Sequence, residues 1–149
     1  MPVRIYLPAT LAELTGPDLS PRLVHAVTDA LRQALPDEDD EGLEYAAQLL
    51  ASDDSLDLLG DQDQQRRCVV AADVPQERVR AVEEPHAPSV VELTVPVAWD
   101  TVACAHVDED AAGADVVAAR AGDGPAAERL AERDLLWYDV SELGTLARP

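Results

Sequence analysis

The sequence predicts an α+β domain in which a mostly antiparallel sheet carries helices on one face. Two observations support this class. Short runs rich in valine, leucine and tyrosine have the length and composition of strands; these runs are residues 3–7, 66–74, 90–97, 101–107 and 135–140. Between them lie segments whose apolar residues recur three and four positions apart, as on one face of a helix. The predicted strands and helices occur in groups along the chain and do not alternate one by one. This order favours a mostly antiparallel sheet.

The chain has the length of one domain, and we expect residues 1–149 to form a single α+β unit. A chain of 149 residues can bury a continuous core. The expected order is a strand, helices, two or three strands, helices and a last strand. This order resembles a ferredoxin-like βαββαβ layout with additions.

The most regular helical pattern lies between residues 20 and 35. Ser20 and Pro21 are typical of a helix N-cap and first helical position, and Pro36 closes the pattern. The apolar stripe consists of Leu23, Val24, Val27, Leu31 and Leu35. The sequence therefore predicts a helix from Pro21 to Leu35.

A second helical stripe follows an acidic loop and is interrupted by Asp53 and Asp54. This interruption predicts one helix from Leu43 to about Ala51 and a separate short helix over residues 55–60. Two further helices are expected; they are residues 110–120 and 125–133, with Gly122 and Gly124 between them. The remaining segments are typical of a linker and a tail; they are the proline-rich residues 75–89 and residues 141–149.

The chain carries a net charge of −19, and all eleven of its basic residues are arginine. Between residues 37 and 63 there are eleven acids and no base. The electrostatic field of this negative charge repels nucleic acids and anionic membranes and favours basic partners. We therefore expect no direct binding to nucleic acid or membranes, and a basic protein as partner; a homo-oligomer stays open.

Two features predict a cytoplasmic location. No apolar run is long enough to span a membrane, and the first residues lack the basic and apolar regions of a secretion signal. Cys68 and Cys104 both lie in apolar runs, which favours buried free thiols over a disulfide.

The segment TVACAHVDEDAAG, which begins at Thr101, concentrates potential metal ligands. Cys104, His106 and Asp108 alternate along a strand and are expected on one of its faces. Together with Asp73, at the end of another strand, His106 and Asp108 are candidate ligands for a transition metal. The competing interpretation is structural, with Cys104 in the core and Asp108 as a helix cap.

Other chemistry finds less support in this segment. A calcium loop is excluded because Ala112 and Ala119 occupy two positions that need oxygen ligands. A nucleophilic pair of Cys104 and His106 is disfavoured, because two strand residues separate their backbones by about 7 Å. Neither a phosphate-binding glycine motif nor a serine-nucleophile motif occurs in the sequence, and we expect no cofactor.

Aromatic and acidic residues mark a candidate interface. Trp137 and Tyr138 are adjacent in a predicted strand and so point to opposite faces. One is expected in the core, and the other is a candidate interface anchor. The candidate acids for a basic partner are Asp39, Asp40 and Glu41.

Five segments together resemble a family of small acidic actinobacterial proteins of unknown function. They are RIYLPATL, LEYAAQLLASDDSLDLL, RRCVVAADVP, AHVDEDAAGADVVAA and DLLWYDVSEL. The resemblance covers nearly the whole chain and carries no catalytic residues with it. The absence of lysine and asparagine fits the high-GC genome that such a source implies.

The sequence thus favours a cytoplasmic, non-enzymatic accessory or protein-interaction domain with a strongly acidic surface. Two alternatives stay open. One is a metal-dependent hydrolase that uses His106, Asp108 and Asp73. The other is a nucleic-acid mimic whose carboxylates occupy a DNA-binding protein.

Overall fold

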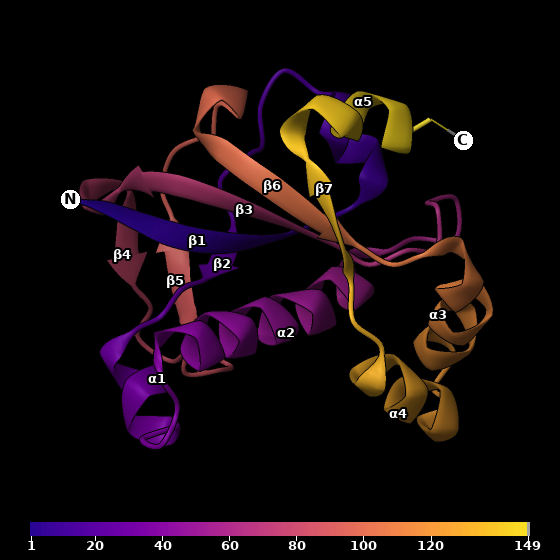
Figure 1. The fold of residues 1–149 in the computed structure, drawn as a ribbon, viewed down its shortest axis with the longest axis horizontal. Helices are drawn as coiled ribbons and strands as arrows, with labels where there is room; N and C mark the ends of the chain where they lie inside the picture. The colour runs from indigo at the N-terminus through magenta and orange to yellow at the C-terminus, as the bar shows by residue number, and fades with distance from the viewer. Residues whose placement is uncertain (149) are drawn as a thin grey trace.

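The computed structural model describes residues 1–148 and contains within them one seven-stranded sheet and five α-helices (Figure 1). The strands are β1 (Pro2–Ala9), β2 (Leu23–His25), β3 (Cys68–Pro75), β4 (Val79–Ala81), β5 (Val90–Leu93), β6 (Val102–Val107) and β7 (Leu136–Asp139). The helices are α1 (Asp29–Ala34), α2 (Asp40–Leu58), α3 (Gly113–Arg120), α4 (Gly124–Glu132) and α5 (Leu143–Leu146). The strands are ordered β4-β5-β2-β1-β3-β6-β7, and every neighbouring pair is antiparallel. The predicted α+β class with an antiparallel sheet is confirmed.

One part of this topology is shared with ferredoxin-like layouts. Strands β2 and β3 both run antiparallel to β1, which lies between them, so they are parallel to each other. Helices α1 and α2 connect these two strands. This is a split βαβ unit, which β4 and β5 extend on one side and β6 and β7 extend on the other.

The long central strands β1 and β3 separate two cores. They pair over eight residues, and their side chains alternate between the two faces of the sheet. On one face Ile5 and Leu7 pack in a cluster that α5 and the turn at Leu11–Thr15 close. On the other face Tyr6 packs in a cluster beneath α1 and α2. Both faces of the sheet are therefore covered at its centre.

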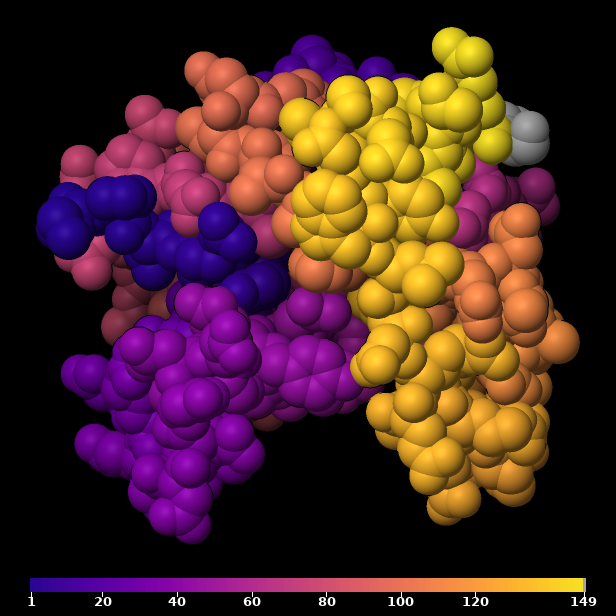
Figure 2. All heavy atoms as spheres, in the orientation of Figure 1, coloured from indigo at the N-terminus to yellow at the C-terminus, as the bar shows by residue number. Residues whose placement is uncertain are grey.

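Helices α3 and α4 form a separate packing unit at the end of α2. Val116 and Leu130 contact each other there in a small cluster with Leu59. In the space-filling view, the purple residues of α1 and α2 and the orange residues of α3 and α4 form two separate projections from the molecule (Figure 2). Within residues 1–148, no helix has the length and apolar character that crossing a membrane requires.

The predicted helix over 21–35 is wrong in its first half. Residues Leu23–His25 form β2, which pairs with β1 on one side and β5 on the other. The helix α1 begins later, where the Thr28 hydroxyl accepts a hydrogen bond from the Leu31 backbone N–H at 3.0 Å. Val24 and His25 are fully buried in the sheet, so strand pairing and burial override the local helical spacing.

The predicted break in the second helix is also wrong, because α2 is continuous from Asp40 to Leu58. Its face near the expected break is polar but buried. The Ser55 hydroxyl donates to the Ala9 carbonyl at 2.8 Å and accepts from the Cys68 backbone N–H at 2.9 Å. These hydrogen bonds attach α2 to the central strands where the apolar stripe is interrupted.

The segments expected to be a linker and a tail contain ordered elements. Residues 75–89 hold the edge strand β4, which pairs with β5. The tail contains α5, whose Leu143 is buried in the first core. The two helices expected after residue 110 are confirmed as α3 and α4, and Gly122 takes a positive φ of 97° between them. That left-handed conformation suits glycine.

Candidate functional site

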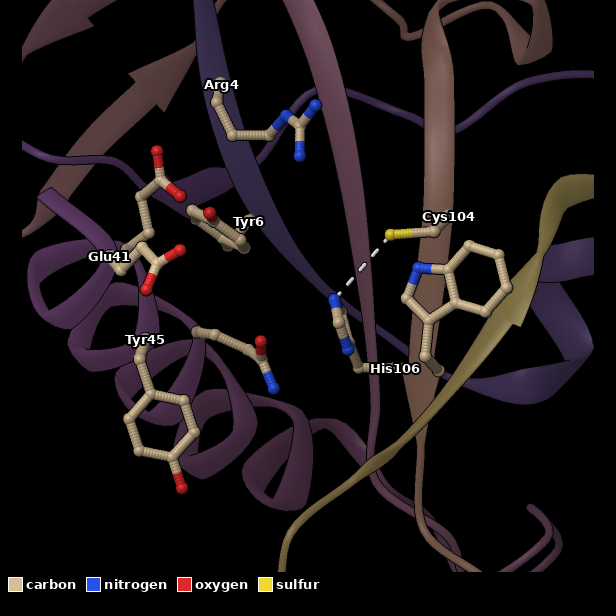
Figure 3. Close-up of a pocket in the computed structure, with 9 residues that line it drawn as sticks. Arg4, Tyr6, Glu41, Tyr45, Cys104 and His106 are labelled. Atoms are coloured by element: carbon tan, nitrogen blue, oxygen red, sulfur yellow. Dashed lines mark hydrogen bonds between the residues drawn. The ribbon is translucent and has the colours of Figure 1, made fainter.

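A cavity of about 280 Å³ opens on the α2 side of the sheet, between the first turns of α2 and strands β6 and β7 (Figure 3). Its lining consists of Arg4, Tyr6, Glu41, Glu44, Tyr45, Gln48, Cys104, His106 and Trp137. Figure 3 shows Glu41 and Tyr45 on the helix, across the opening from Cys104 and His106 on the strand. The site therefore combines aromatic rings, carboxylates, a thiol and an imidazole.

The strand β6 supplies the thiol and the imidazole from one of its faces. The Cys104 Sγ lies 3.6 Å from the His106 Nε2 (Figure 3). The backbone separation that disfavoured this pair is bridged because both side chains lean along the strand toward each other. The separation of the two backbones therefore does not keep the Cys104 and His106 side chains apart.

The protonation states of this pair do not favour nucleophilic chemistry. Burial raises the pKa of the Cys104 thiol above its ordinary value, although the neighbouring Trp137 indole opposes this shift. Burial also lowers the pKa of His106, and the charge of Arg4 adds to the effect. Both groups are consequently neutral near pH 7, whereas a cysteine nucleophile needs a thiolate.

The sheet floor of the cavity is formed by β1, where Arg4 lines the cavity and pairs with Asp73 on the neighbouring β3, outside the lining. Arg4 donates from Nε and Nη2 to the two carboxylate oxygens of Asp73, at 2.8 and 3.0 Å. This contact pairs the positive charge of the Arg4 guanidinium with the Asp73 carboxylate. It also holds the pKa of Asp73 below its usual range. Burial raises the pKa of neighbouring Tyr6 to about 12, so its phenol stays protonated. The floor is therefore electrically neutral.

The helical wall of the cavity is negatively charged. Glu41 and Glu44 are exposed, and neither forms a salt bridge within the described part of the chain, residues 1–148. Tyr45 is also exposed and donates its hydroxyl to Asp134 at 2.6 Å. Opposite this wall, the Trp137 side chain is 60% exposed. Uncompensated carboxylates and aromatic faces together are suited to a cation.

The residues predicted to bind a metal do not meet in the structure. The Asp108 carboxylate is buried and accepts from Arg67 Nε and Nη2 at 2.8 and 2.9 Å. The Asp73 carboxylate is held by Arg4. Only His106 lies in the cavity. Both carboxylates are thus engaged by arginines, and Arg66, next to Arg67, pairs with Asp110 in the same segment.

The aromatic candidates lie on opposite faces, as alternation predicts. Trp137 lines the cavity, whereas Tyr138 is half-buried against the core on the other face. Of the acidic candidates, Glu41 lines the cavity. Asp39 caps α2 by accepting from the Gly42 N–H at 2.8 Å, and Asp40 accepts from Arg32 at 3.1 Å.

Several lining residues were missed by sequence reasoning, although a signal existed. Glu44, Tyr45 and Gln48 were missed, but they follow the candidate Glu41 at i+3, i+4 and i+7, which places all four on one helical face. Arg4 and Tyr6 alternate on β1, which places them on one strand face. Nothing in the local sequence indicates that this face of α2 and this face of β1 line the same cavity.

The fold and the site together define a class: an antiparallel α+β protein with an open, acidic and aromatic-lined cavity beside its long helix. The chain belongs to the family of unknown function DUF6912, whose model matches residues 3–147. The resemblance to a family of unknown function is thereby confirmed. Comparison with curated proteins and with solved structures found no match.

Proposed function

We propose that the protein is a non-enzymatic interaction domain that binds a basic protein partner through this cavity. The observation that carries the proposal is the exposed Trp137 indole opposite Glu41 and Glu44, two carboxylates without a salt bridge in residues 1–148. Tryptophan is enriched among the residues that anchor protein interfaces.

The chemistry of the lining favours a cationic side chain as the occupant. An arginine or lysine of the partner would enter between the carboxylates on α2 and the indole on β7. Its charge would be paired with Glu41 or Glu44, and its flat or methylene part would stack on Trp137. The ion pair between Arg4 and Asp73 leaves no free positive charge on the floor to repel it.

The surroundings would add long-range attraction. Asp39 and Asp40 lie at the start of α2, beside the cavity, and the whole chain carries a charge of −19. Such a field raises the association rate of a basic partner and makes binding weaken with salt. A cytoplasmic role as an accessory domain is part of this proposal. The nucleic-acid mimic stays an alternative prediction, whereas the hydrolase that uses His106, Asp108 and Asp73 lacks a shared ligand site, because arginines hold both carboxylates.

The experiment is a calorimetric titration with an arginine-rich peptide at low and high salt. The double variant Glu41→Gln/Glu44→Gln should bind several-fold more weakly, because each exposed ion pair contributes up to about 1 kcal/mol. The matched control is Glu128→Gln/Glu132→Gln, which removes the same charge from exposed positions on α4. Equal weakening in both variants would show a nonspecific charge effect and contradict a cavity-directed function.

A further inference from the structure

Away from the cavity, three side chains from distant parts of the chain converge at the other end of the sheet. His25 comes from β2, Asp54 from α2 and His86 from the segment that leads into β5. The His25 Nε2 lies 2.6 Å from an Asp54 carboxylate oxygen, and the His86 Nε2 lies 2.9 Å from the same oxygen. One atom of each residue lies within 4.8 Å of the other two, and this is the only such group of three or more His, Cys, Asp or Glu among residues 1–148.

We propose that His25, Asp54 and His86 form a binding site for a first-row transition-metal dication of the zinc class. Two imidazole nitrogens and one carboxylate oxygen are the donor set of zinc sites that keep a fourth position open. The same set suits neither Mg²⁺ nor Ca²⁺, which take oxygen ligands. On metal binding, the two nitrogens and the oxygen would turn from contacting one another to contacting a shared ion.

The buried histidine is oriented as a metal ligand would be. His25 is fully buried, and its Nδ1 lies 2.6 Å from the hydroxyl of Ser89, which is also fully buried. The Ser89 carbonyl in turn accepts from the Ala26 backbone N–H at 2.9 Å, which fixes the position of the serine. A partner at Nδ1 fixes the ring and leaves Nε2 directed at Asp54, which is the outer-shell arrangement of metal-bound histidines.

The site is open on one side. A cavity of about 250 Å³ is lined by Asp54 and His86, and its remaining lining includes Asp57, one helical turn beyond Asp54. Water or a further carboxylate could therefore take the fourth position. Arg22 also lines this cavity, but its guanidinium is held by Glu13 at 2.5 and 3.0 Å. No unpaired cation from this wall opposes the metal.

The competing interpretation is a hydrogen-bonded staple in which both imidazoles donate to Asp54 and attach the segment around His86 to α2. The two interpretations predict different responses to metal. A staple gains no stability from zinc, whereas a metal site gains stability in proportion to the logarithm of the zinc concentration above the Kd.

The test is a titration of untagged, chelator-stripped full-length protein with Zn²⁺ in excess Mg²⁺, and with Co²⁺ as a spectroscopic probe. We expect one zinc per chain, a rise in Tm, and the visible absorption of tetrahedral Co²⁺. His86→Ala should weaken zinc binding more than about 100-fold, beyond the 10- to 100-fold typical of outer-shell changes. Because His86 is half-exposed, this variant should stay folded, and its Tm without metal checks this.

Two more variants complete the test. Asp54→Asn should weaken zinc binding as His86→Ala does, and the adjacent Asp53→Asn is the matched control on the same helix. His106→Ala removes the one remaining histidine, beside the Cys104 thiol. The proposal is overturned if zinc does not bind, if His86→Ala binds like the original protein, if Asp53→Asn loses as much as Asp54→Asn, or if only His106→Ala loses the metal.

Discussion

The Arg67 guanidinium holds the Asp108 carboxylate in a fully buried, two-pronged ion pair at 2.8 and 2.9 Å. Asp108 also accepts from the Arg67 backbone N–H at 2.9 Å. The pair joins the residue just before β3 to the residue just after β6, and Asp108 lies within the segment that the sequence marked as a metal site. The aspartate most suggestive of chemistry is therefore a structural element.

This pair predicts a large loss of stability when one partner is removed. Asp108→Ala should lower the free energy of unfolding by about 3–5 kcal/mol, because a buried guanidinium would be left without its counter-ion. The measurement is urea denaturation. The matched control is Asp110→Ala, two residues away and exposed, which should leave the midpoint nearly unchanged. An unchanged unfolding midpoint in Asp108→Ala would contradict the structural role of this pair.

The continuity of α2 predicts unequal roles for two buried serines. Ser55→Ala removes the hydroxyl that bridges the Ala9 carbonyl and the Cys68 N–H, and should cost about 2–3 kcal/mol because buried backbone groups lose a partner. Ser52→Ala is the control. Its hydroxyl donates at 2.6 Å to the Leu49 carbonyl, which keeps its helical hydrogen bond. Equal losses in thermal or urea unfolding would contradict the attachment of α2 through Ser55.

The position of the first helix predicts which cap residue matters. Thr28→Ala should cost about 1 kcal/mol, because its hydroxyl caps α1 and also donates to the Pro88 carbonyl at 2.6 Å. Ser20→Ala, at the cap that the sequence predicted, should change stability by less than about 0.5 kcal/mol. If chemical denaturation showed a larger loss of stability for Ser20→Ala than for Thr28→Ala, the result would support the longer helix and contradict the assignment of β2.

The neutral state of Cys104 predicts slow alkylation. Because burial raises its pKa, less thiolate exists at a given pH than in free cysteine, so the reaction rate should be lower and its inflection should lie at higher pH. Cys68 is fully buried with a pKa raised to about 12 and should not react. The measurement is the pH profile of iodoacetamide labelling followed by mass spectrometry. An inflection below that of free cysteine would reveal an activated thiol and favour an enzyme.

The elements that the sequence predicts well are those whose stabilisation is local or whose pattern is continuous. β3 is an apolar run interrupted only by Asp73, and α4 has an Asp123 cap followed by Pro125. β2 could not be predicted, because its three residues are extended only by pairing with β1 and β5. The same holds for the continuity of α2 past Asp53 and Asp54, since Ser55 becomes a core residue only once the strands lie beneath it.

The candidate sites divide in the same way. Trp137 and Glu41 could be selected from their residue types and their expected exposure. Their meeting in one cavity depends on the tertiary arrangement of α2 against β7. The group around Asp54 left no local signal, because His25 and His86 lie 29 and 32 residues from it in the sequence.

The most direct test of the proposed function is an NMR titration with an arginine-rich peptide that follows the indole N–H signals. The chain has two tryptophans, and Trp99 is a built-in control because its indole donates to the Gly16 carbonyl at 2.8 Å, away from the cavity lining. A cavity that binds a basic side chain predicts a saturable shift of the Trp137 signal, weakened by salt, while the Trp99 signal stays in place. A Trp137 signal that does not move as the peptide binds would contradict the proposed function.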